Sequence, residues 1–136
     1  MDYREKIQAS IDYIEDHLSE ELSLDELAKR AFLSKFHYHR VFHQLTGETV
    51  MTYIRKRRLT EAARELSESS VKIMELAMKY QFGSSESFSR AFKRIFHTSP
   101  WTFKQANLEV LQYRKLDILH KKPSVQRPMD SICRAA

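Results

Sequence analysis

Two sets of side chains, each at helical spacing, have the chemistry needed to recognise the edges of base pairs. The first set combines an aromatic ring, an imidazole and a guanidinium: Phe36, His39 and Arg40. Arginine can donate two hydrogen bonds to guanine, phenylalanine can contact a thymine methyl, and histidine can bond a base edge or a phosphate. The second set is shorter and contains a carboxylate that could accept from cytosine N4: Ser85, Glu86, Ser89 and Arg90. We expect the first set to read DNA more strongly, with a solvated surface as the alternative for either arginine.

The two sets occupy the same place in a repeated pattern. Leu27-Ala28 corresponds to Leu76-Ala77, 49 residues later, and Arg40-Val41-Phe42 corresponds to Arg90-Ala91-Phe92, 50 residues later. A pattern that occurs only twice indicates a duplicated unit rather than a solenoid. Each copy predicts a helix with a Leu-Ala pair, a short turn and a capped second helix, which is typical of a helix-turn-helix.

Helices must position both sets, and apolar periodicity with capping residues predicts seven of them. They should cover about residues 3–18, 24–31, 35–45, 49–66, 71–80, 86–96 and 100–120. Glycine occurs twice and proline three times, and no segment has the pattern of a strand, so we predict an all-α fold. The expected parts are an N-terminal helix-turn-helix subdomain (1–47), a connecting helix (48–67), a C-terminal helix-turn-helix subdomain (68–110), and a helical extension with a disordered tail (111–136).

Charge changes sign along the chain. Residues 1–26 hold nine acidic and two basic side chains, whereas residues 27–136 hold nine acidic and twenty-one basic ones. A basic region of this kind indicates a polyanionic partner, most commonly nucleic acid. Phosphate contacts, which fix register but carry no sequence information, are expected from Lys35, Arg55, Arg57, Lys93, Arg94 and Lys104. The successive bases 55–58 cannot all face DNA, so Arg58 could instead form a structural ion pair.

Other chemistries have weaker support. Cys133 is the sole cysteine, which excludes an intrachain disulfide and favours a reduced, cytoplasmic setting. The N-terminal residues do not form a signal peptide and no apolar run approaches a membrane span, so we expect no membrane partner. His39 and His43 have a spacing that can ligate a metal, but no acid or cysteine completes a site. We therefore expect no metal, no cofactor and no enzymatic activity.

Over about residues 5–105 the sequence resembles the AraC/XylS family of bacterial regulators, and most closely the small stand-alone MarA/SoxS/Rob branch. The matching segments are 24–33, 34–42, 46–47, 53–59, 73–82, 87–93 and Pro100. The resemblance implies recruitment of RNA polymerase and an asymmetric DNA site of about two helical turns. It also adds Ser87 to the base-contacting positions named above.

At three turns the sequence departs from that family, which often has glycine there. This chain has Phe32, Gln81 and His97 instead. A non-glycine residue in the left-handed conformation costs roughly 1–2 kcal/mol. Either these turns are not left-handed in this chain, or they carry strain.

We therefore predict a sequence-specific, double-stranded DNA-binding transcription regulator. It should act more often as an activator, and bind two successive major-groove segments as a monomer. No ligand-sensing domain is expected before residue 3, which is consistent with control by abundance. The alternatives are that the chain is the DNA-binding piece of a longer ancestor, with residues 106–136 a remnant of a linker, or that a helix at 106–120 docks a partner. The alternative is a helical interaction module or anti-activator, which would keep the fold but show no salt-dependent DNA affinity.

Overall fold

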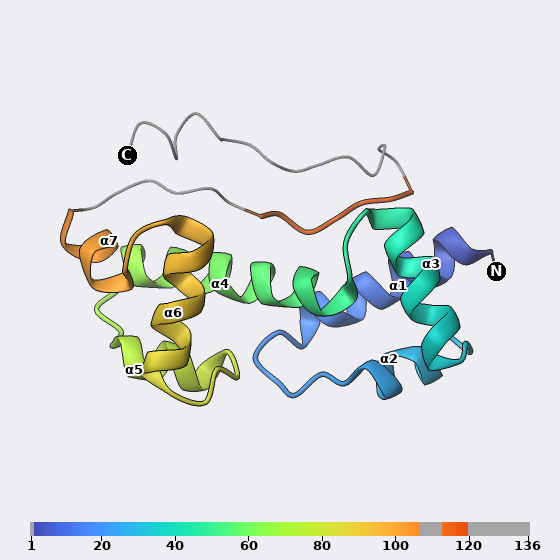
Figure 1. Cartoon of the computed structure of the whole chain (residues 1–136), viewed down its shortest axis with the longest axis horizontal. Coiled ribbons are helices and arrows are strands. Elements are labelled where there is room, and N and C mark those ends of the chain that lie inside the picture. The colour runs from blue at the N-terminus through green and yellow to red at the C-terminus, as the bar shows by residue number, and fades with distance from the viewer. Residues whose placement is uncertain (1, 107–112, 120–136) are drawn as a thin grey trace. The chain divides into compact units, whose positions relative to one another are not determined.

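The computed structural model describes residues 2–106 and 113–119, and it is helical as predicted (Figure 1). These residues form seven helices and no strand: α1 (Tyr3–Asp16), α2 (Leu24–Arg30), α3 (Lys35–Thr46), α4 (Val50–Glu68), α5 (Ile73–Lys79), α6 (Ser85–Phe96) and α7 (Pro100–Ala106). In these ranges no helix is long and apolar enough to cross a membrane.

The chain divides into two compact units. The described residues of unit 1 are 2–55 and 115–119, and those of unit 2 are 56–106 and 113–114. Helix α4 therefore contributes its first residues to unit 1 and the rest to unit 2. The expected tail, residues 120–136, lies outside the described residues, as do residues 107–112.

Unit 1 packs α1, α2 and α3 around an apolar core. On α1, Ile7, Ile11 and Ile14 are fully buried, at the i, i+4, i+7 spacing of one helix face. Tyr38 and Phe42 of α3 are also fully buried and lie with ring centroids 6.0 Å apart. This face of α3 is therefore fixed in the core, which leaves its opposite face for solvent.

Unit 2 has an aromatic core built largely from α6. Phe88, Phe92 and Phe96 follow at i, i+4 and i+8, and all three are buried. The Phe92 ring packs edge-on against Phe96 at 4.7 Å and lies 5.7 Å from Phe103 of α7. Aromatic pairs at these distances and angles stabilise a core beyond the area they bury.

All three non-glycine residues at the departing turns are left-handed. The φ angles are 59° at Phe32, 68° at Gln81 and 63° at His97, in the region that favours glycine. The sequence left open whether these turns are left-handed, and the structure shows that they are, so all three carry strain. Gly47 has φ 84° at the end of α3, so His97 at the end of α6 occupies the equivalent place without the freedom of glycine.

The prediction of a helix continuing to about residue 120 is wrong for residues 113–119. They contain no helix, and their backbone is bonded to distant side chains instead. In unit 1 the amide of Ile118 donates to Gln8 Oε1 at 2.9 Å, and Gln8 Nε2 donates to the carbonyl of Leu116 at 3.3 Å. Leu116 and Ile118 are buried, at the two-residue period of an extended chain.

Candidate nucleic-acid interface

Each unit contains a helix-turn-helix whose turn is closed in the same way. The left-handed residue follows α2 in unit 1 and α5 in unit 2. The next amide then bonds back five residues: Leu33 N–H to the Ala28 carbonyl at 3.0 Å, and Phe82 N–H to the Ala77 carbonyl at 2.8 Å. This is the Schellman arrangement for ending a helix. The Leu-Ala repeat seen in the sequence thus supplies buried packing residues and the turn's acceptor.

Helix α3 begins at a capped turn and presents the first candidate set. The Ser34 hydroxyl accepts from the amide of His37 at 3.1 Å, which satisfies one of the free N–H groups of the first turn. Because Tyr38, Val41 and Phe42 are buried, the remaining face is exposed. It carries Phe36, His39 and Arg40, all three exposed.

Phe36 and Arg40 form a pair on this face. The Phe36 side chain is 73% exposed, although phenylalanine is among the residues most often buried. The Arg40 guanidinium lies 5.2 Å from the centroid of its ring, within the range of a cation–π interaction. An arginine held this way keeps its N–H groups available, so the pair can offer a base edge both an apolar surface and hydrogen-bond donors.

Helix α6 repeats this construction in unit 2. The Ser84 hydroxyl accepts from the amide of Ser87 at 3.1 Å. The exposed face carries Glu86 and Arg90, whereas Ser85, Ser87 and Ser89 are half-buried. The structure thus brings the predicted second set together on one helix, with shorter and less accessible side chains than the first.

The basic side chains expected at phosphates fall into two groups. Lys35, Arg55, Lys93 and Arg94 are exposed, and Lys104 is half-buried and donates to the Ser69 carbonyl at 3.2 Å. Lys35 lies 3.4 Å from Asp25 in an exposed ion pair, which adds little to stability. All five remain candidates for phosphate contact.

Arg57 departs from the expectation, because its side chain lies inside unit 2. It is 7% exposed, pairs with Glu61 at 3.0 Å and donates to the Tyr113 carbonyl at 2.5 Å. A guanidinium so enclosed cannot also reach a phosphate, so we do not retain it in the interface. The i, i+4 spacing of Arg57 and Glu61 was the available signal for this ion pair.

Arg58 is also buried, and burial lowers the pKa of its guanidinium. Its neighbours on α4 therefore divide between solvent and core, as four successive helical positions must.

In the described part of the chain no group of three or more His, Cys, Asp or Glu side chains could hold a metal ion.

The chain has recognisable relatives. A family described as a helix-turn-helix domain matches residues 27–106. The chain is 43% identical over 100 residues to the Transposon Tn10 TetD protein of Escherichia coli, covering 74% of this chain and 72% of that one. It is 38% identical over 103 residues to the multiple antibiotic resistance protein MarA of Escherichia coli, covering 76% and 81%.

Longer proteins and solved structures match as well. The chain spans about a third of the uncharacterized HTH-type transcriptional regulator YbfP of Bacillus subtilis, at 39% identity over 104 residues, which is 76% of this chain and 35% of YbfP. The DNA-binding domain of AdpA, described as a global transcriptional factor and solved with a target DNA, matches with a TM-score of 0.69 and 28% identity. That match covers 72% of this chain and 88% of the AdpA chain.

Proposed function

Because the chain belongs to the AraC-type helix-turn-helix transcription regulators, we propose that it reads specific double-stranded DNA sites through α3 and α6. The observation that carries this proposal is the repeated construction of the two helices. In each, buried aromatic residues fix one face, and an exposed arginine lies at the same register on the other: Arg40 and Arg90. The second helix of a helix-turn-helix is the element that enters a major groove.

We assign the stronger base reading to α3. Its exposed face offers the Phe36–Arg40 pair and the imidazole of His39, which suit a thymine methyl, a guanine and a polar base edge in turn. On α6, Arg90 is the long donor, and Glu86 favours cytosine N4 while repelling nearby phosphates. The half-buried serines at 85, 87 and 89 can make only short contacts.

Phosphate contacts would fix the register of each unit on the duplex. Lys35 at the start of α3 and Lys93 and Arg94 near the end of α6 belong to the recognition helices themselves. Arg55 and Lys104 lie on neighbouring helices. Each phosphate neutralised should release condensed counterions and make affinity fall with salt.

The proposed mode is a single chain that places one recognition helix in each of two successive major-groove segments, about 34 Å apart along the duplex. A protein bound in this way would regulate a nearby promoter. We propose activation through contact with RNA polymerase, supported by the relatedness to AarP, described as a transcriptional activator, at 41% identity over 88 residues.

Selection from a random double-stranded DNA library at near-physiological salt tests this proposal. Two enriched base clusters about ten base pairs apart are expected, since that is one helical turn. Arg40→Ala should relax preference at one base pair within one cluster and Arg90→Ala at one base pair within the other, each costing about 1–3 kcal/mol. Lys6→Ala removes the same charge from α1, outside both recognition helices, and serves as the matched control.

The outcomes separate the alternatives. One cluster only would mean that α6 holds the backbone without reading bases. No enrichment, together with an intact fold and no salt-dependent affinity, would overturn the proposal and favour a protein-interaction role.

A further inference from the structure

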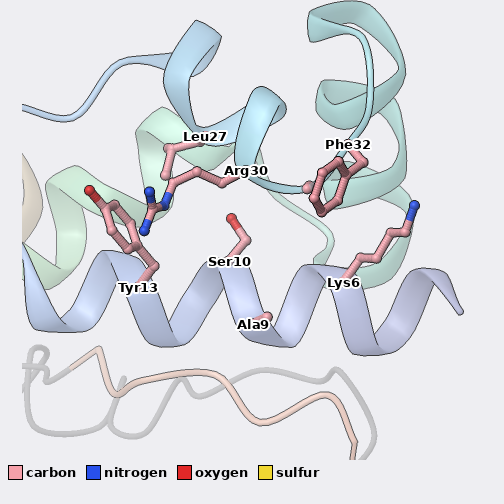
Figure 2. A pocket seen from close by; sticks show the side chains of 8 residues that line it. Lys6, Ala9, Ser10, Tyr13, Leu27, Arg30 and Phe32 are labelled. Carbon is pink, nitrogen blue, oxygen red and sulfur yellow. The ribbon is translucent and has the colours of Figure 1, made fainter. Parts of the chain in front are cut away.

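A groove of about 520 Å³ opens on unit 1 between α1 and α2, and none of the residues that line it is among those assigned to DNA (Figure 2). Its floor is α1, where the small side chains of Ala9 and Ser10 leave space. Leu27 of α2 and Ala31, which caps the end of that helix, form an apolar wall with Phe32 in the turn that follows. Lys6 and Arg30 lie toward its two ends (Figure 2).

Both cations of the groove lack an acidic partner. Neither Lys6 nor Arg30 forms an ion pair with any residue that the structure describes, although the N-terminal region is rich in acids. The Arg30 guanidinium lies 3.9 Å from the centroid of the Tyr13 ring, which stacks on His17 from another side. The arginine is therefore held in place by a ring, and its hydrogen-bond donors stay open to a ligand.

Phe32 distinguishes this groove from ordinary protein surface. Its side chain is 85% exposed, and its backbone has the left-handed φ of 59°. An exposed phenylalanine buries no core surface in return for that strain. Backbone strain clusters at ligand sites, although the turn that ends α2 also requires this conformation. A flat apolar ring beside unpaired cations is the surface that an aromatic anion complements.

We propose that this groove binds a small aromatic carboxylate. The ring would lie against Phe32 above Ala9 and Ser10, and the carboxylate would accept from Arg30, whose planar fork matches two carboxylate oxygens. Lys6 would attract the anion from the opposite end. Positions 6 and 13 are two turns apart on α1, so the floor is about 10 Å long, enough for a fused two-ring acid.

Titration of the full chain with 2-naphthoate, followed by backbone amide NMR shifts in the absence of DNA, tests this site. We expect saturable shifts at Ala9, Ser10 and Phe32, with a Kd of roughly 0.1–1 mM for a ligand of about thirteen heavy atoms. Arg30→Gln should weaken binding about tenfold and Lys6→Gln a few-fold. Lys29→Gln removes an exposed cation from the same helix outside the groove and should leave Kd within twofold.

Phe32→Gly separates binding from folding, because glycine relieves the left-handed strain while removing the ring. This variant should fold at least as well as the wild type and bind about tenfold more weakly. Three results would overturn the proposal: no saturable shift with 2-naphthoate, equal affinity for uncharged 2-naphthol, or wild-type affinity in Arg30→Gln or Phe32→Gly.

Discussion

Replacing His97 with glycine should stabilise unit 2. His97 ends α6 with φ 63°, and its amide donates to the Lys93 carbonyl at 2.8 Å. Its imidazole is exposed and has no hydrogen bond or ion pair with the residues the structure describes, so the substitution removes little beyond the strain. Glycine can keep the same backbone bond because it reaches this conformation without steric cost.

The expected gain is about 1 kcal/mol. The left-handed conformation costs an L-residue roughly 1–2 kcal/mol. Glycine removes this cost but offsets about 0.4–1 kcal/mol of the gain, because it makes the unfolded chain more flexible. Trp101 is the sole tryptophan and belongs to α7 of unit 2, so its fluorescence reports on this unit during urea unfolding. With a urea dependence of about 1–2 kcal/mol per molar, the midpoint should rise by roughly 0.5–1 M.

Gly47 supplies the reciprocal control. It has φ 84° at the end of α3, and a Cβ placed there would meet no atom within 4 Å. Gly47→Ala therefore adds only conformational strain, and should destabilise unit 1 by about 1 kcal/mol, as followed by circular dichroism. A His97→Gly midpoint equal to or below that of wild type would refute the strain argument, as would a neutral Gly47→Ala.

Three further outcomes are expected. Arg57→Met should lower the free energy of unfolding by about 2 kcal/mol, because Glu61 and the Tyr113 carbonyl lose a buried donor. It should leave the salt dependence of DNA binding unchanged, and a changed slope in filter binding would mean that Arg57 contacts a phosphate. Partial burial raises the pKa of Glu65, but hydrogen bonds from Tyr80 and Lys79 outweigh this and hold the pKa below its ordinary value of 4.5. The ionised carboxylate therefore stabilises the fold above pH 4.5, and this contribution should be lost as the pH falls through the lower pKa of the folded state. Glu65→Gln should therefore flatten acid unfolding below about pH 4.5, and an unchanged acid curve would contradict the assignment. Lys35→Ala should weaken binding evenly across DNA sequences and reduce the salt slope by about one, whereas a sequence-dependent loss would make it a base contact.

Local patterns were sufficient to predict the two helix-turn-helix units. Apolar spacing, serine caps and the Leu-Ala repeat all depend on neighbours within a few residues, and the structure has the expected helices around them. The exposed set on α3 followed for the same reason, since one buried face of a helix determines which residues lie opposite. The left-handed turns could not be decided in advance, because each residue type tolerates both conformations at different cost.

Long-range contacts account for what the sequence analysis missed. Arg57 and Arg55 are both basic residues on one helix. Glu61, one turn beyond Arg57, was a local signal for the ion pair, but the contact with Tyr113, far along the chain, distinguishes the buried arginine from the exposed one. Residues 113–119 contain enough apolar side chains to suggest a helix. Their extended path depends on a glutamine more than a hundred positions earlier, which no local pattern could indicate.

That glutamine also bears on where the smallest stable fragment should end. The side-chain amide of Gln8 bonds the backbone of residues 116–118 as a neighbouring strand would: it accepts from the Ile118 amide and donates to the Leu116 carbonyl. The side chains of Leu116 and Ile118 are buried in unit 1. The matched family ends at residue 106, before this segment. A fragment cut there would expose the polar edge of Gln8 and the apolar surface beneath Leu116 and Ile118, and would be prone to self-association. Recombinant versions meant for DNA-binding assays should therefore extend to at least residue 119.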